Sequence, residues 1–186
     1  MAESAADGHI AVLRSTPAWP YDSEPPLSPA PTAGIYSSGG TLLGEVALSP
    51  PGPDTTGVQI ALSGNRLVVL TTALHEPSGP ATVTLEVYDW TTGQLTGTWP
   101  VGVHSSGGEV SFAVHGQLAA VEGPSRLHLV DLATGKDATI AKASHTDSPP
   151  ALNAHGLVYA LDPHYNGPGR LVFVPPAKLL ADVAAG

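Results

Sequence analysis

The sequence predicts an all-β protein built as an array of repeated four-stranded antiparallel units. The first observation is its content of turn-forming residues, with 21 glycines and 19 prolines among 186 residues. Each interior proline costs a helix about 3 kcal/mol, so this composition disfavours long helices. The second observation is that apolar segments flanking a glycine turn recur along the chain, and the third is a repeated Asp-x-x-Thr-Gly motif. Such repeats indicate a fold assembled from one structural unit.

The first hairpin of each unit combines a short apolar strand, a glycine-containing turn and a second strand rich in Val, Leu and Ala. Its three aligned copies are ALSGNRLVVL (61–70), AVHGQLAAV (113–121) and LNAHGLVYAL (152–161). The turn glycines of these copies are 52 and 40 residues apart. This spacing sets the length of the repeat.

A second hairpin follows each copy of the first. The segments are TLEVYDWTTGQLTGTWPV (84–101), LHLVDLATGKDATIAKA (127–143) and RLVFVPPAKLLADVA (170–184), and IYSSGGTLLGEVAL (35–48) fits the same slot near the N-terminus. Two hairpins give four antiparallel strands per unit. A unit of 40–52 residues corresponds to one blade of a β-propeller.

We therefore expect a single β-propeller-like domain over residues 1–186. The predicted blades cover about 4–50, 57–103, 108–144 and 150–184. The first blade is expected to be incomplete, because 7–14 align with the second strand of the next blade and only Ser4–Ala6 remain for a first strand. A proline-rich loop, 15–34, interrupts this blade.

An incomplete first blade predicts an open or partial propeller, since a closed ring requires about 4–8 blades. A solenoid-like β-stack is the structural alternative. The Ala- and Leu-rich segment AKLLADVAA (177–185) also has the composition of a short helix, in place of the last strand. We expect exposed strand edges at the first and fourth blades, and therefore self-association through these open blade edges.

The charge balance argues against nucleic acid as a partner. The chain carries 16 acidic and 7 basic residues, a net charge of −9, and its basic residues are scattered singly rather than clustered. No cysteine is present, which excludes disulfides and thiolate metal sites. No apolar run reaches the roughly 18 residues of a membrane-spanning helix, and MAESAADGHIAVLR lacks the pattern of a signal peptide. We expect a soluble chain without membrane insertion. Its compartment stays open, and a secreted or periplasmic full-length protein is compatible with the sequence.

The Asp-x-x-Thr-Gly motif has a structural task at every position. A glycine supplies the positive φ that a tight hairpin turn needs, and the aspartate and threonine oxygens accept hydrogen bonds from turn N–H groups. We therefore interpret both copies as turns rather than reactive sites. The residues assigned to these turns are Asp89, Thr92, Gly93, Asp131, Thr134 and Gly135.

The two copies, VYDWTTGQL and LVDLATGKD, resemble the turn between the third and fourth strands of WD40-like, YVTN-like and quinoprotein-like propeller repeats. In quinoprotein propellers the motif continues to a tryptophan four residues after the glycine. Gly97 and Thr139 hold that position here, and the nearest tryptophan is Trp99. This departure weakens the quinoprotein branch and the pyrroloquinoline quinone cofactor that it implies.

The resemblance implies that ligands bind on the face formed by the loops between second and third strands and between blades. In that register His75, His104, His145 and His164 fall on this face, together with Glu76, Glu109, Asp147 and Asp162. Imidazole and carboxylate groups suit a divalent metal, which could activate a water as in lactonase-like propellers. The competing interpretation is that exposed loops carry polar residues by chance, because no compact His-x-x-x-His spacing is present.

Two aromatic residues, Trp19 and Tyr21, lie in the proline-rich loop. They form either a recognition platform or an anchor that holds the loop against the blades. The serine beside His104 lacks the Gly-x-Ser-x-Gly elbow of a hydrolase, so a catalytic triad is not favoured.

Two functional hypotheses follow from these observations. The first is a non-catalytic propeller segment, without a cofactor, that serves as a binding scaffold for a protein or glycan through its loop face. The second is part of a propeller enzyme, either a metal-dependent lactonase-like hydrolase or a quinoprotein-like oxidase, whose site is completed by missing blades.

Overall fold

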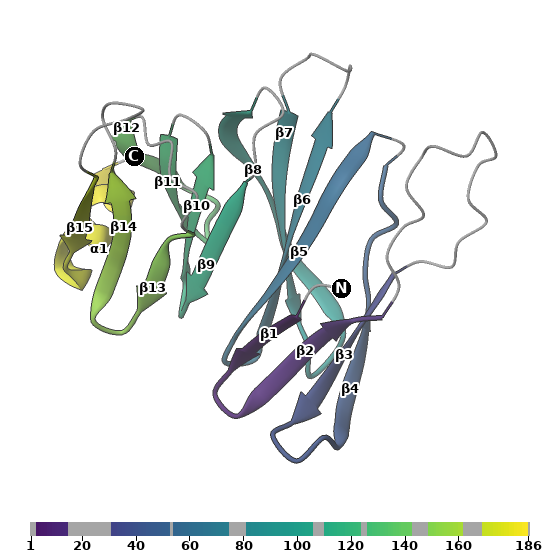
Figure 1. Cartoon of the computed structure of the whole chain (residues 1–186). Helices are drawn as coiled ribbons and strands as arrows, with labels where there is room; N and C mark the ends of the chain where they lie inside the picture. Colours follow the sequence, from purple (N-terminus) through teal and green to yellow (C-terminus); the bar gives the residue numbers. More distant parts are fainter. Residues whose placement is uncertain are drawn as a thin grey trace. The chain divides into compact units, whose positions relative to one another are not determined.

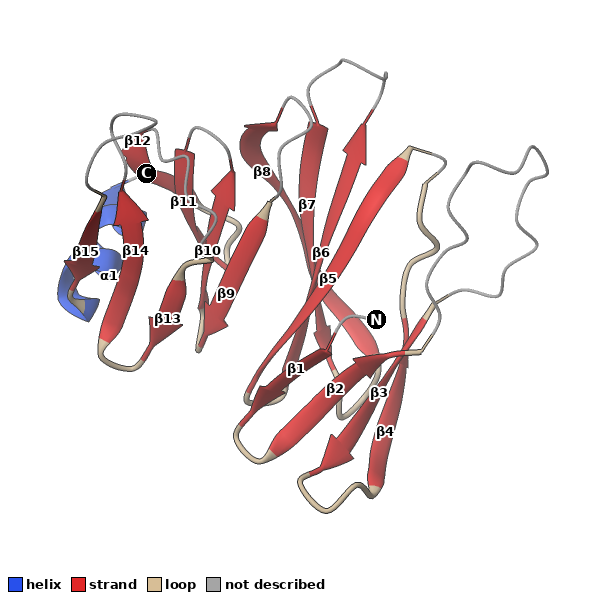
Figure 2. Cartoon of the chain, viewed as in Figure 1, coloured by secondary structure: helices blue, strands red, loops and turns tan. Residues whose placement is uncertain are grey.

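The computed structural model describes residues 3–14, 31–52, 54–74, 81–105, 110–123, 126–142, 149–161 and 169–185. Within these ranges the chain forms β-strands almost throughout, with one helix near its C-terminal end (Figure 2). The predicted all-β fold is confirmed. Across the same ranges, none of the helical structure has the length and apolar character needed to cross a membrane.

The strands form four antiparallel sheets, each made of strands that are consecutive in the chain (Figure 1). The first sheet contains β1 (Glu3–Ala6), β2 (His9–Leu13), β3 (Thr32–Ser37) and β4 (Leu42–Ala47). The second contains β5 (Thr55–Ser63), β6 (Arg66–Leu74), β7 (Ala81–Asp89) and β8 (Gln94–Ser105). The third contains β9 (Ser111–His115), β10 (Leu118–Gly123), β11 (Arg126–Asp131) and β12 (Asp137–Lys142). The fourth contains β13 (Ala151–Asn153), β14 (Gly156–Leu161) and β15 (Arg170–Val174), and α1 (Pro176–Ala185) follows it.

The first sheet is complete, so the expectation of an incomplete first blade is wrong. β1 pairs with β2 from Glu3↔Val12 to Ala6↔His9. The connecting residues Asp7 and Gly8 have φ values of 52° and 76°, and positive φ at both central positions is the pattern of a type I′ hairpin turn. Because this turn uses only two residues, the few residues before it are enough for a strand.

The fourth sheet has three strands in the described residues, and the expected fourth strand is replaced by α1. Pro175 and Pro176 interrupt the strand after Val174, because proline has no N–H for the sheet ladder. Proline is also well suited to the first helical position, and the Ala- and Leu-rich residues that follow continue the helix. Leu179 and Val183, four positions apart on one helix side, are buried.

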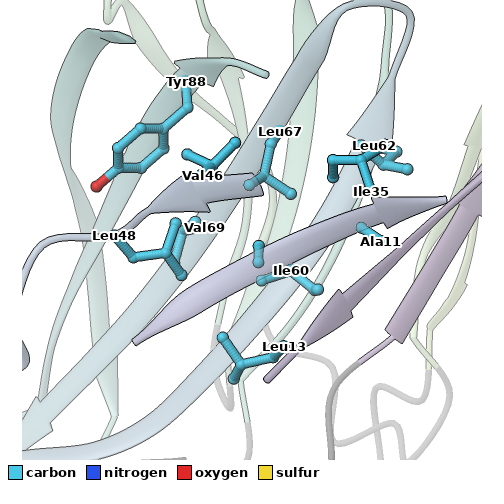
Figure 3. Packing of buried hydrophobic residues seen from close by; sticks show 11 residues of the cluster. Ala11, Leu13, Ile35, Val46, Leu48, Ile60, Leu62, Leu67, Val69 and Tyr88 are labelled. Carbon is cyan, nitrogen blue, oxygen red and sulfur yellow. The ribbon is translucent and has the colours of Figure 1, made fainter. Parts of the chain in front are cut away.

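The chain folds into two compact units, Met1–Ala73 with Leu85–Thr98, and Leu74–Thr84 with Trp99–Gly186. In the first unit the core lies between the first sheet and the strands β5, β6 and β7. Figure 3 shows this core from close by. Its buried members are Ala11, Leu13, Ala33, Ile35, Val46, Leu48, Ile60, Leu62, Leu67, Val69 and Tyr88. The phenol of Tyr88 accepts a hydrogen bond from the Ser49 N–H at 2.9 Å and donates one to Glu86 at 2.9 Å.

In the second unit the core lies between the third sheet, the fourth sheet and α1. The helix contacts β11, β12 and β14. The buried residues of this core are Ala120, Leu127, Leu129, Leu157, Tyr159, Val174, Leu179 and Val183. The helix therefore contributes apolar side chains to this core without adding a strand to the fourth sheet.

Candidate functional site

Most of the residues predicted to bind a ligand lie outside the described part of the chain. His75, His145 and His164 fall there, as do Trp19 and Tyr21. His104 belongs to β8, but its side chain also lies outside what the structure describes. Among the described residues, no group of three or more His, Cys, Asp or Glu side chains could hold a metal ion. The metal site and the aromatic platform stay predictions.

The first Asp-x-x-Thr-Gly copy closes the turn between β7 and β8. The Asp89 carboxylate accepts hydrogen bonds from the Thr91 N–H at 2.9 Å and the Thr91 hydroxyl at 2.6 Å. Its other oxygen accepts one from the Asn65 amide at 3.0 Å, in the turn between β5 and β6. The Gly93 N–H donates to the Asp89 carbonyl at 2.8 Å, and Gly93 has a φ of 73°. The hydroxyl of Thr92 accepts a long hydrogen bond, 3.4 Å, from the N–H of Gln94.

These hydrogen bonds have an electrostatic consequence at Asp89. The bond from the Thr91 hydroxyl, assisted by those from the backbone and from Asn65, holds the pKa of the Asp89 carboxyl below its ordinary value. A carboxylate that accepts several hydrogen bonds is favoured in its charged form. Asp89 therefore joins two turns of the second sheet as an anion.

The second copy closes the turn between β11 and β12 in the same way. The Asp131 carboxylate accepts hydrogen bonds from the N–H groups of Ala133 at 2.8 Å and Thr134 at 3.1 Å. The Gly135 N–H donates to the Asp131 carbonyl at 2.7 Å, with φ at 74°. The Thr134 hydroxyl accepts from the Lys136 N–H at 3.4 Å. In both copies the polar groups of the motif bind the backbone of the turn, and in the first copy Asp89 also binds the side chains of Thr91 and Asn65.

The two copies differ in what lies above the glycine. In the second unit the indole of Trp99 covers Gly135: a Cβ added to this glycine would lie 2.2 Å from Cε3 of Trp99. The same indole donates a hydrogen bond from Nε1 to the Leu132 carbonyl at 3.1 Å. A Cβ at Gly93 would meet no described atom within 4 Å. The absence of a side chain at Gly135 thus leaves room for the indole of Trp99 from β8, whereas Gly93 serves only the turn.

Trp90 makes a related contact in the first unit. Its Nε1 donates to the Gly64 carbonyl in the β5–β6 turn at 2.9 Å, and its ring lies 5.3 Å from that of His9. Trp90 follows Asp89 directly, so the motif also supplies an anchor for the neighbouring turn. The sequence contained both tryptophans, but no spacing rule linked either of them to its partner turn.

A buried histidine and a partly exposed aspartate form a pair in the second unit. Nδ1 of His128 in β11 is 2.8 and 3.0 Å from the two carboxylate oxygens of Asp137 in β12. With Asp137 as a carboxylate, which only accepts hydrogen bonds, Nδ1 of His128 is the donor of this bond. Asp137 also accepts a hydrogen bond from the Gly102 N–H in β8 at 3.2 Å. The pair therefore connects β8, β11 and β12.

The His128–Asp137 pair has the residue types of the general base and its orienting acid in a hydrolase, but it lacks their access to a substrate. The His128 side chain is only 4% exposed, and its Nε2 is buried with no hydrogen-bond partner in the described residues. A general base must come within about 2.6–3.2 Å of the proton it removes. A nitrogen enclosed in this way cannot approach a substrate from solvent, so we assign the pair a structural role.

The outer face of the fourth sheet exposes large apolar side chains. Leu171 is 78% exposed and Phe173 is 58% exposed, both on β15. The alternate residues Val172 and Val174 belong to the core shared with the third sheet. The Phe173 ring lies over Gly156, where an added Cβ would come within 3.0 Å of it. β15 thus has one covered apolar face and one exposed apolar face.

Comparison with known proteins adds no functional assignment, because no family model matches the chain and no curated protein matches it. The functional argument rests on the geometry of the described residues.

We expect Gly135→Ala to destabilise the protein more than Gly93→Ala. Both substitutions cost about 1–2 kcal/mol for positive φ, and only the methyl group at position 135 would also overlap Trp99, which adds about 1–3 kcal/mol. Urea denaturation measures both free energies of unfolding. In a Trp99→Ala background the two glycine substitutions should have equal effects. A difference that persists there would contradict the packing of Trp99 against Gly135.

Asp89 should contribute stability that depends on pH. Its pKa is depressed in the fold, so the stabilisation is present above the unfolded-state value of about 3.9 and is lost as pH falls through the lower folded-state value. Asp89→Asn should therefore be less stable than the wild type at neutral pH, and the gap should close as pH falls below about 4. Urea midpoints across this range measure the gap, and a gap that widens with acid would contradict the assignment.

Asp137→Ala should destabilise the protein by about 1–3 kcal/mol, because it leaves the buried Nδ1–H of His128 without its acceptor. The matched control is Asp182→Ala, which removes a carboxylate of similar exposure, paired with the exposed Lys178 at 2.9 Å on α1. The control should cost no more than about 0.5 kcal/mol. Equal thermal and urea stabilities of the two variants would refute the structural role of the His128–Asp137 pair.

Proposed function

We propose that the chain is a propeller-type segment whose function is to bind a protein partner as a scaffold. The observation that carries this proposal is the exposed apolar face of the fourth sheet, formed by Leu171 and Phe173. Full burial of a leucine or phenylalanine side chain contributes about 1.5–3 kcal/mol. Contiguous exposed apolar surface is a feature of protein interaction sites, whereas single exposed apolar residues are common on any protein surface.

The chemistry of this face favours a protein over a glycan. Val158 and Ala160 of β14 pair with Phe173 and Leu171 across the strands, so the two exposed side chains continue an apolar surface. A glycan requires polar groups that bind its hydroxyls, whereas a protein partner can bury an apolar surface against its own core residues. The loop face that the propeller resemblance implies lies largely outside the described residues and adds no support.

The propeller arrangement is part of the proposal. Four consecutive antiparallel sheets with short hairpin turns support it, as does the core that each unit forms between the faces of two sheets. Propellers and sheet stacks share these local features, and propellers commonly serve as interaction scaffolds.

The test compares proteins retained from a lysate of the source organism by three immobilised forms of the chain. Leu171→Glu/Phe173→Glu should lower retention of a specific partner by at least about tenfold relative to the wild type, which corresponds to about 1.4 kcal/mol. Leu95→Glu, at an exposed leucine of β8, is the matched control and should retain that partner. If the fourth-sheet variant retains the same proteins in the same amounts as the wild type, the proposal fails.

A further inference from the structure

The second strand of each sheet follows one packing rule. β2, β6, β10 and β14 each begin directly after a two-residue turn, so their positions can be compared by counting from the first residue of each strand. In the first unit, the third and fifth residues of β2, Ala11 and Leu13, lie in one core with the second and fourth residues of β6, Leu67 and Val69. In this core, the face of the first sheet that carries the third and fifth residues of β2 therefore packs against the face of the second sheet that carries the second and fourth residues of β6.

The second unit repeats this rule with different side chains. Ala120, the third residue of β10, lies in one core with Leu157 and Tyr159, the second and fourth residues of β14. Side chains alternate between the two faces of a strand. The residues at third and fifth positions thus form one type of face, and those at second and fourth positions form the complementary type.

Among the described residues, the first and the fourth sheet each expose apolar side chains on a face outside these cores, and the two faces are of opposite type. On the first sheet, Ile10 occupies the second position of β2 and is 36% exposed. It pairs across the strands with Tyr36, which pairs with Leu42, 46% exposed. These three residues form a row across three strands on the outer face of the first sheet, with an exposed aliphatic side chain on either side of Tyr36.

On the fourth sheet, Val158 and Ala160 occupy the third and fifth positions of β14, beside Phe173 and Leu171. These four residues form the outer face of the fourth sheet. Each chain therefore exposes one face of each type, on two different sheets. Contact between these two types of face also forms the core of each unit.

We propose that the outer face of the fourth sheet binds the outer face of the first sheet of a second copy of this chain, head to tail. This inference rests on the proposed function, because it names the partner of the same apolar face. Such a contact joins two different surfaces, and it closes into a ring when the rotation between copies permits. Two copies of a four-sheet chain supply eight sheets, within the range of about 4–8 blades found in propellers.

The charges on the outer face of the first sheet are compatible with binding a second copy of the chain. Arg14 donates hydrogen bonds to Tyr36 and forms an ion pair with Glu45, and its guanidinium lies 5.5 Å from the centre of the Tyr36 ring. The ion pair balances its own charge, so the face presents no net charge at this cluster. The whole chain carries −9, so copies repel one another at low salt. Association through apolar faces should strengthen as salt screens this repulsion.

The experiment is sedimentation velocity on the full chain with two face variants, Leu171→Glu/Phe173→Glu and Ile10→Glu/Leu42→Glu. All four positions are exposed, and circular dichroism confirms that each variant is folded. The wild type should be a dimer or larger at about 100 μM, above the micromolar Kd of modest interfaces. Each variant alone should be a monomer, because each loses one half of the contact.

An equimolar mixture of the two variants tests whether the contact joins the fourth sheet of one copy to the first sheet of another. Each variant retains the face that the other lacks, so the mixture should form a dimer with one copy of each. A wild type that stays monomeric overturns the inference, as does a first-sheet variant that still dimerises, which would indicate a symmetric fourth-sheet contact. A monomeric wild type that retains a lysate partner sensitive to Leu171→Glu/Phe173→Glu would refute the second copy and leave the proposed function standing.

Discussion

The fold depends on one constraint, which is that its inner strands are apolar on both faces. Leu67 and Val69 of β6 lie in the core shared with the first sheet, and the intervening Val68 and Leu70 are buried as well. A sheet of this kind cannot leave either face in water at low cost, since each exposed large side chain forfeits about 1.5–3 kcal/mol. Packing one sheet on another satisfies the constraint within each unit, whereas the outer faces of the first and fourth sheets leave Ile10, Leu42, Leu171 and Phe173 exposed.

Such stacking requires a fixed register, and the turns provide it. A slip of one residue would move every side chain of a strand to the opposite face. The two-residue turns with positive-φ glycines and the aspartate-capped turns prevent this slip at the ends of the hairpins. Trp99 and the His128–Asp137 pair then tie a strand of one sheet to a turn or strand of the next. The polar groups of the motif therefore maintain the alternation on which the apolar cores rely.

The sequence predicted the features that are local. Alternating apolar residues and glycine turns located the hairpins, and the two prolines before residue 177 indicate why a helix replaces the last strand. β1 was missed because four residues are too few to show a period. The partners of Trp99 and His128 were missed because they come from other strands or turns. Leu171 and Val172 are both apolar, so only the packing of neighbouring sheets reveals which of them is exposed.

The packing of Trp99 against Gly135 also restricts which residues the second turn accepts. Position 135 combines a left-handed backbone with an indole packed against it, so a side chain there requires a smaller residue in place of Trp99. Position 93 has the same backbone requirement and open space above it, and asparagine, which adopts positive φ more readily than most residues, fits there. The two Asp-x-x-Thr-Gly motifs thus differ in what they accept at the glycine, because position 135 is coupled to Trp99 and position 93 meets no described side chain.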